Sequence, residues 1–196
     1  MPWLQLPAPL VLASTSKYRQ AQLARLGVKF STFAPDYDEA DVPGLDPRQL
    51  IAFHAREKAA AVRAAHPDPS VWILAADQGV VLGDKLLGKP HTVTNAIAQL
   101  LELAGQTHEL RTHLVLDLPG WQLRKTSVAH VRLRSLTREE AEAYVLQDMP
   151  LDCAGSYKIE CAGPWLFESL HSDDPTAIEG LPLISVAQML REAAGR

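Results

Sequence analysis

The amino-acid sequence predicts a mixed α/β fold in which helices flank a long, partly antiparallel central sheet. The apolar run Val71–Ala76 has the length of a strand and no alternation, which indicates a strand buried on both faces. Two further strands, Leu110–Leu116 and Gln122–Leu133, are separated by a Pro-Gly pair and are expected to pair across it. The second alternates apolar and polar residues, so one of its faces should be solvated.

The chain begins with a strand, a turn and a helix. The apolar run Leu10–Ala13 leads into a Ser-Thr-Ser turn, after which Leu23 and Leu26 mark the inner side of a helix that Gly27 ends. Residues Val28–Phe33 can form a second strand, which leads into an acidic loop.

The next helix has strong start and stop signals. Asp46 is a good N-cap, Pro47 suits the first helical position, and Gln49 can complete a capping box. The helix should run to about His66, because Pro67 cannot continue it. Its inward-facing residues are Ile51, Ala55, Ala59 and Val62.

The remaining elements follow from turns and caps. Residues Val80–Leu87 read as a hairpin with a II′-type turn at Gly-Asp. Thr94 is expected to cap a helix that Gly105 ends, and a capping box at Thr137 opens another helix to about Gln147. A last amphipathic helix covers Leu183–Ala193. No repeat or linker divides the chain, so residues 1–196 are expected to form a single domain.

Composition narrows the function classes. The chain has 196 residues, 47% of them hydrophobic and 21% charged, as in ordinary soluble globular proteins. The net charge of −4, without a basic block, gives no support to nucleic-acid binding. No apolar run approaches the ~20 residues that span a bilayer, and no signal peptide is evident. Cys153 and Cys161 are expected to be reduced thiols, and the expected compartment is the cytoplasm.

The first strand, turn and helix form a candidate anion site. Free backbone N–H groups and the helix dipole point outward together at such a turn, and Arg19 adds a positive charge. Ser14 and Ser16 supply hydroxyl groups at the same place. The ordinary alternative is a strand-to-helix turn in which Ser16 is only an N-cap.

Asp77 is the best catalytic candidate. It follows Val71–Ala76, and the carboxyl ends of strands are where open α/β sheets bind their ligands. The alternative is a capping or turn aspartate. Lys58 and Lys89 come from separate elements, and Gly-Lys-Pro holds Lys89 in a short loop. Most lysines are simply solvated, but with Arg19 these two could bind a triphosphate.

Taken in order, the motifs resemble one family. They are LVLASTSKYRQ, DYDE, EKA, AADQ, GKP, AGSYKIE and GLPL, and they extend over nearly the whole chain. The set is similar to the Maf family of nucleoside triphosphate pyrophosphatases, and most to its YceF-type branch, which is associated with 7-methyl-GTP. The resemblance implies two lobes around a central cleft. It also implies hydrolysis of the α-β phosphate bond, which removes unwanted nucleotides from the pool.

The resemblance assigns roles to individual positions. It implies that Asp77 accepts the proton of the attacking water, and that Glu39 and Asp77 hold a divalent metal. The histidines are scattered without zinc spacing, so oxygen ligands and Mg²⁺ or Mn²⁺ are expected. The rest of the acidic run around Glu39 reads as a solvated loop. The positions that match the polar signature of the family are Ser14, Arg19, Glu39, Lys58, Asp77 and Lys89.

The resemblance places Tyr18, Gln78 and Glu160 at three positions that differ between the branches of the family. The branch that acts on thymidine and uridine nucleotides is expected to have Arg, Thr and Gln there. The Glu160 carboxylate only accepts hydrogen bonds, which suits the donor edge of guanine. A 7-methylguanine is cationic and would stack on Tyr18. The alternative is that Tyr18 and Glu160 are ordinary surface residues.

Two residues depart from the pattern of the family, since Lys17 replaces a proline and Gly79 replaces an apolar residue. Three other functions remain open: a pyrophosphatase for UTP, dTTP or CTP, a nucleotide-binding regulator of cell division, and a sugar-nucleotide or phosphate-ester hydrolase. The expected partner is a nucleoside triphosphate, with a homodimer as a further expectation and no membrane or stable nucleic-acid partner.

Overall fold

A long sheet crosses the molecule in the computed structural model, which describes residues 5–195. Within that range the sheet has seven strands, ordered β2-β1-β3-β5-β6-β7 with β4 paired to β3. The strands are β1 Leu10–Leu12, β2 Phe30–Thr32, β3 Trp72–Leu82, β4 Lys85–Leu87, β5 Thr107–Leu118, β6 Trp121–Leu133 and β7 Phe167–Ser172. Strand β1 runs parallel to β2 and β3, and the other pairs are antiparallel, which confirms the mixed sheet.

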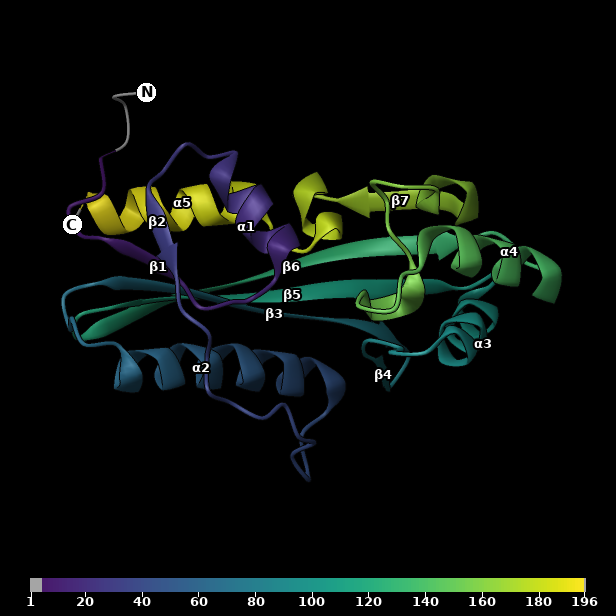
Figure 1. The fold of residues 1–196 in the computed structure, drawn as a ribbon, viewed down its shortest axis with the longest axis horizontal. Coiled ribbons are helices and arrows are strands. Elements are labelled where there is room, and N and C mark those ends of the chain that lie inside the picture. The colour runs from purple at the N-terminus through teal and green to yellow at the C-terminus, as the bar shows by residue number, and fades with distance from the viewer. Residues whose placement is uncertain (1–4, 196) are drawn as a thin grey trace.

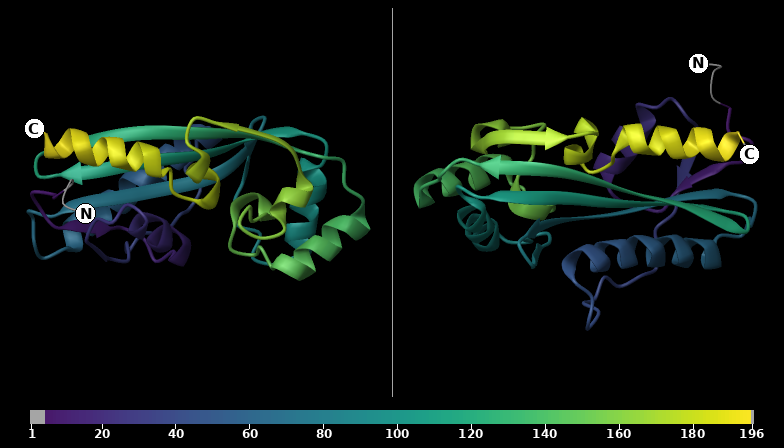
Figure 2. Two further views of the ribbon diagram at one scale, coloured as in Figure 1. Left: turned by 90° about the horizontal axis from the view of Figure 1, so that it is seen from above. Right: turned by 180° about the vertical axis from the view of Figure 1, so that it is seen from behind.

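The helices occupy both faces and one end of this sheet (Figure 1). They are α1 Lys17–Ala24, α2 Pro47–Ala65, α3 Val93–Leu103, α4 Arg138–Asp148 and α5 Leu183–Ala194. Three short 3-10 turns are η1 Ala154–Ser156, η2 Gly163–Leu166 and η3 Pro175–Glu179. Helix α2 lies on one face and α5 on the other, while α3 and α4 gather at the opposite end of the long strands, as the views of Figure 2 also show. No helix among the described residues is long and apolar enough to cross a membrane.

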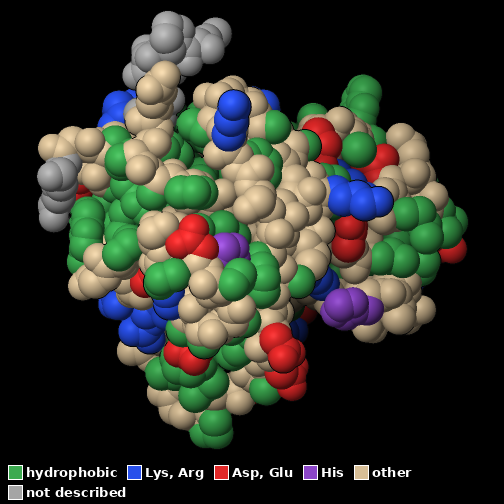
Figure 3. Space-filling view, turned by 60° about the vertical axis from the view of Figure 1, so that its left-hand side comes forward, with side chains coloured by type: hydrophobic (Ala, Val, Ile, Leu, Met, Phe, Trp, Pro, Cys, Tyr) green, Lys and Arg blue, Asp and Glu red, His purple; other side chains and the backbone are tan. Residues whose placement is uncertain are grey.

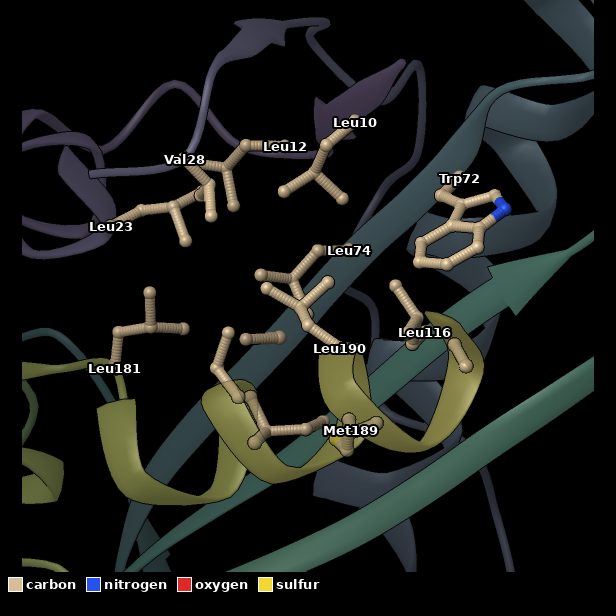
Figure 4. Packing of buried hydrophobic residues seen from close by; sticks show 14 of the residues in the cluster. Leu10, Leu12, Leu23, Val28, Trp72, Leu74, Leu116, Leu181, Met189 and Leu190 are labelled. Carbon is tan, nitrogen blue, oxygen red and sulfur yellow. The ribbon is translucent and has the colours of Figure 1, made fainter. Parts of the chain in front are cut away.

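Side chains along β3 alternate between the two faces of the sheet, and helices cover both faces, so the strand is buried on both sides. Trp72, Leu74 and Ala76 join the cluster beneath α5, which Figure 4 shows from close by. Ile73 and Ala75 pack instead against the inner side of α2. A third cluster, at the far end, joins α3 and α4 to β5 and β6. One strand thus separates two apolar layers, and Asp77 follows Ile73 and Ala75 on the α2 face.

Most of the predicted starts and turns are confirmed. Both capping boxes form, at Asp46 and at Thr137. Strand β3 turns into β4 at Gly83, whose φ of 60° fits the predicted II′ turn. The two cysteines are free.

Three expectations were wrong or incomplete. Asp77 does not end its strand, because β3 continues to Leu82 while pairing with β5 from Ile73 to Val81. The cap of α3 is Thr92 rather than Thr94, since the Thr92 side chain accepts the backbone N–H of Asn95. The strand β7 was not predicted. It is half-exposed and lacks an apolar run.

Candidate active site

The site lies where one edge of β3 is left open. On that edge β1 pairs with β3 only as far as Leu74, and β4 begins to pair only at Val80. Arg19, from the first turn of α1, fills part of the gap. Its Nη1 donates to the carbonyl of Ala76 at 2.8 Å, and its Nε donates to the carbonyl of Gly180 at 3.3 Å. The short β1 strand therefore creates the opening, and Arg19 ties the edge of the sheet to the segment before α5.

A cleft of about 1260 Å³ surrounds this open edge. Figure 3 shows the surface hollowed between two masses of the molecule, with acidic, basic and histidine side chains around the hollow. The cleft is lined by segments from both ends of the fold. Its lining includes each site residue predicted from the sequence: Ser14, Ser16, Tyr18, Arg19, Glu39, Lys58, Asp77, Gln78, Lys89 and Glu160.

A lysine joins two carboxylates at the wall of the cleft. The Nζ atom of Lys58 on α2 lies 2.5 Å from Oδ1 of Asp77 and 2.8 Å from Oε1 of Glu39. The side chains of Lys58 and Asp77 are more than nine-tenths buried, whereas that of Glu39 is 50% exposed. Because a buried charge is costly unless it is paired, the pairing explains how Asp77 is tolerated on the apolar α2 face.

The electrostatic environment keeps Glu39 ionised. Burial alone would raise the pKa of the Glu39 carboxyl, but the hydrogen bond and charge of Lys58 outweigh it, and Lys89 adds to the effect. The net result is a pKa below the ordinary value of 4.5. Lys89 itself is exposed, and among the described residues it forms no ion pair and donates no hydrogen bond. Its ammonium is therefore available to an anion in the cleft.

The Ser-Thr-Ser turn is held by its own hydroxyl groups. Oγ of Ser14 accepts the backbone N–H of Ser16 at 3.1 Å, and Oγ of Ser16 accepts that of Arg19 at 3.4 Å. Ser16 is thus the N-cap of α1, which is the alternative to an anion site that the sequence left open. The turn also lines the cleft, so capping and anion binding are compatible at this position.

A second link between the acidic loop and α2 was missed by sequence reasoning. The Tyr37 hydroxyl lies 2.7 Å from Nδ1 of His54, and both side chains line the cleft. Burial, followed by the charge of Glu57 and Glu39, raises the pKa of Tyr37. The available signal was spacing, since His54 and Lys58 are four residues apart and share one side of a helix.

The three branch-distinguishing positions lie on different walls of the cleft. The Gln78 amide donates to Oγ1 of Thr112 and to the carbonyl of Ala177, both at 2.8 Å. Since a carbonyl only accepts, the NH₂ group must face it, and the Gln78 oxygen is left as an acceptor. Tyr18 is 37% exposed on α1, and Glu160 is exposed in the turn after η1.

Lys158 supports Tyr18 and was also missed. Its Nζ lies 5.8 Å from the centre of the Tyr18 ring and donates to the carbonyls of Asp148 and Met149. Burial lowers the pKa of Lys158, but the hydrogen bond to the Tyr18 hydroxyl and the nearby Cys153 and Asp152 raise it by more. The net shift of the pKa is upward. Lys158 therefore links Tyr18 on α1 to the C-terminal end of α4.

A family model for Maf-like proteins matches residues 9–193. The chain belongs to the Maf family. Relatives from Xanthomonas axonopodis pv. citri and Pseudomonas putida, both named 7-methyl-GTP pyrophosphatase, are each 45% identical over 184 residues. The alignments cover 94% and 93% of this chain and 96% and 95% of those proteins. A solved dITP/XTP pyrophosphatase from Mycobacterium abscessus matches at a TM-score of 0.45 and 16% identity, over 95% of this chain and 96% of that one.

The Maf match spans all ten candidate positions, and it confirms the resemblance that the ordered motifs indicated. The packing of the structure accounts for Gly79, where the resemblance led us to expect an apolar residue. A Cβ atom on Gly79 would lie 2.6 Å from Cδ1 of Leu86 and 3.1 Å from Cδ1 of Ile51. Those two side chains fill the space that a larger residue would take, which explains the glycine in this Maf protein.

The donor set of the cleft fits a hard divalent cation. Glu39 and Asp77 converge on one point, at present the Lys58 ammonium, so two carboxylates can share a single cation. Among the described residues no group of three or more His, Cys, Asp or Glu could enclose a metal. Mg²⁺ suits such an open arrangement, because it usually takes one or two carboxylates together with water and substrate phosphates.

Proposed function

We propose that this Maf protein is a nucleoside triphosphate pyrophosphatase that hydrolyses 7-methyl-GTP to 7-methyl-GMP and pyrophosphate. The observation that carries the proposal is the Glu39–Lys58–Asp77 group in a large cleft whose other walls supply cations. The names of the relatives support the substrate. The biological role would be to remove a modified nucleotide from the pool.

Asp77 is proposed as the general base. Lys58 binds Oδ1 of its carboxylate, so Oδ2 is the atom proposed to accept the proton of the attacking water. The water oxygen would bond to the α-phosphorus while the bond to the bridging oxygen breaks, and pyrophosphate leaves. Because the carboxylate belongs to a strand paired along its length with β5, its position is rigid.

The cationic groups of the cleft are proposed to bind the triphosphate. Lys89 reaches in from the loop after β4, and Arg19 retains N–H groups beyond those used by Ala76 and Gly180. Ser14 and Ser16 sit at the start of α1, where the helix dipole favours an anion. Donors on both sides of the cleft would stabilise the charge that develops on the leaving pyrophosphate.

A divalent cation, Mg²⁺ or Mn²⁺, is proposed to be held by Glu39 and Asp77. When bound, it would supply the charge neutralisation that phosphoryl transfer generally needs. Lys58 keeps both carboxylates close together, which prepares the site for a second positive charge.

The base pocket is proposed to select guanine through acceptors. The free oxygen of Gln78 and the carboxylate of Glu160 match the adjacent donors N1–H and N2–H₂ of guanine. Uracil and thymine offer a single donor on that edge and fit less well. Methylation at N7 adds a positive charge, which would strengthen stacking on Tyr18 by ~0.5–2 kcal/mol.

We further propose that the two ends of the fold act as lobes of one domain, residues 1–196, around this cleft. The lining from the turn after β1, from α1 and from α2 on one side, and from the η1 region on the other, supports that view. The cytoplasmic compartment and the homodimer stay predictions.

The reaction is tested by product analysis in ¹⁸O-labelled water. Incubation of 7-methyl-GTP with the protein and Mg²⁺ or Mn²⁺ should give 7-methyl-GMP and pyrophosphate, with the label in the monophosphate. A chelator should stop the reaction. Release of orthophosphate, or label found in pyrophosphate, would contradict attack at the α-phosphate.

A further inference from the structure

A second hollow, separate from the cleft, lies on the other side of α2. It has a volume of about 280 Å³ and is lined by Leu45, Gln49, Ala52, Arg56, His113 and Arg124. Gln49, Ala52 and Arg56 follow one side of α2, while Ile51, His54 and Lys58 follow the side that lines the cleft. Positions two residues apart lie about 200° apart around a helix, so α2 forms a wall between the two sites.

Two buried side-chain nitrogens beside the hollow lack partners. Nε of Arg56 and Nε2 of His113 are both buried, and neither has a hydrogen-bond partner among the described residues. Nδ1 of His113 lies 2.8 Å from the Thr126 hydroxyl. Arg56 always carries its protons, so its Nε is a buried donor whose cost no described residue offsets.

The hollow is also positively charged. None of the described residues that line it is acidic. Arg124 donates to the neutral oxygen of Gln122. The Arg56 guanidinium lies over the face of Phe53, 5.9 Å from the ring centre, and forms no ion pair among the described residues. The nearby carboxylate of Asp117 is already paired with Arg63 at 2.6 Å. Burial, and then the charges of Arg56, Arg124 and Arg111, lower the pKa of His113, although Asp77 opposes the shift.

We propose that this hollow binds a small dianion of the phosphate class, either inorganic phosphate or pyrophosphate. Two guanidinium groups, the His113 imidazole and the Gln49 amide belong to residues that line the hollow from α2, β5 and β6, and planar guanidinium forks match the oxygens of a phosphate. The space, about 280 Å³, is just below the range of about 300–1,000 Å³ typical of pockets for larger ligands, so we assign it to a small anion rather than to a whole nucleotide. The site would be distinct from the cleft, although His113 is the cross-strand partner of Asp77.

The test follows the imidazole nitrogens of His113 by NMR while inorganic phosphate, or separately pyrophosphate, is added. Sodium chloride at equal ionic strength is the control for screening. Phosphate or pyrophosphate should shift the His113 signals saturably, and chloride should not. Whichever of the two binds more tightly identifies the source of the anion. Shifts that match those in chloride, or the absence of saturation with both anions, would overturn the proposal.

Variants separate the hollow from the cleft. Arg124→Gln changes an exposed residue of β6. This variant and Arg56→Gln should each lower the affinity for the anion at least about tenfold, because each removes a charge-assisted hydrogen bond to it. Arg138→Gln, at an exposed position of α4, controls for the loss of one positive charge. Lys89→Ala changes a residue that lines the cleft and not the hollow. Both should leave the affinity measured at His113 within about twofold. If Lys89→Ala abolishes the shift while Arg124→Gln leaves it unchanged, the anion binds in the cleft and the proposal fails.

Discussion

The ammonium of Lys58 lies 2.5 Å from the carboxylate of Asp77, and both side chains are almost completely buried. Lys58 comes from α2, Asp77 from the middle of β3, and the same ammonium holds Glu39 from a loop. Three separate segments thus meet at one charged point on an otherwise apolar face. Such a group is expensive to bury, and its cost is easiest to understand if its charges serve the reaction.

Replacement of Asp77 by asparagine tests the base. The side chain keeps its shape and can still accept a hydrogen bond from Lys58, but it cannot take a proton. We expect the folded protein to bind nucleotide and to lose at least about 100-fold in turnover. Asp84→Asn, at the exposed tip of the β3–β4 hairpin, is the matched control. Turnover of Asp77→Asn within a few-fold of the unmodified protein would exclude Asp77 as the base.

Acidification should reveal the buried pair of His108 and Tyr157, in which Nε2 of His108 lies 2.9 Å from the hydroxyl. Burial lowers the pKa of His108 from 6.5 to about 4. Between these values the unfolded chain binds a proton that the folded chain does not, so stability falls as the pH falls from 6.5 towards 4. The linked loss is on the order of 2–3 kcal/mol.

The measurement is urea unfolding from pH 7 to pH 4 of the unmodified protein and His108→Gln, whose amide can still bond to Tyr157. The variant should lack this part of the decline, while His130→Gln, an exposed histidine of β6, should keep it. Parallel pH curves for the unmodified protein and His108→Gln would show that burial does not hold the imidazole neutral.

Gly79→Ala tests the packing next to the base. The added Cβ would meet the ends of Leu86 and Ile51, at 2.6 and 3.1 Å. These flexible side chains can move, so we expect a loss of about 1–3 kcal/mol in the free energy of unfolding rather than a failure to fold. Gly88→Ala is the control, because a Cβ there meets nothing within 4 Å. Equal stability of the two variants would mean that the site beside Asp77 is not closely packed.

Local signals in the sequence were sufficient for much of the fold. Caps and turns depend on a few neighbouring residues, and the boxes at Asp46 and Thr137 and the turn at Gly83 form as predicted. The end of β3 does not depend on local signals. Its second half is held by pairing with residues of β5 that lie 28–36 positions later in the chain, so the apolar run up to Ala76 marked only its first half.

The candidate site was predicted mainly through the family resemblance, and its physical logic becomes visible only in three dimensions. Asp77 and Gln78 are adjacent and point to opposite faces of the sheet, yet both line the cleft because it wraps around the open edge of β3. The Tyr37–His54 and Tyr18–Lys158 contacts each join different segments of the chain. Helical spacing indicates that His54 shares a side of α2 with Lys58, but it does not identify Tyr37 or Lys158 as contact partners.

Glu160→Gln tests how the base is read. A neutral amide keeps one acceptor but loses the charge that favours a cationic 7-methylguanine. We expect the preference for 7-methyl-GTP over GTP, expressed as the ratio of kcat/KM values, to fall about tenfold, which corresponds to ~1.4 kcal/mol. Turnover on GTP itself should change less. Glu142→Gln, exposed on α4, is the control. A ratio that is unchanged in Glu160→Gln would remove this carboxylate from the base pocket.

The most direct test of the proposed function is a comparison of kcat/KM for 7-methyl-GTP, GTP, CTP, UTP and dTTP, measured by pyrophosphate release with Mg²⁺ or Mn²⁺. The acceptors proposed at Gln78 and Glu160, together with the ring of Tyr18, predict the highest value for 7-methyl-GTP, a lower one for GTP, and weak activity on UTP and dTTP. A highest value for UTP or dTTP would contradict the proposed base recognition, and absence of pyrophosphate release from all five nucleotides would contradict the enzyme itself.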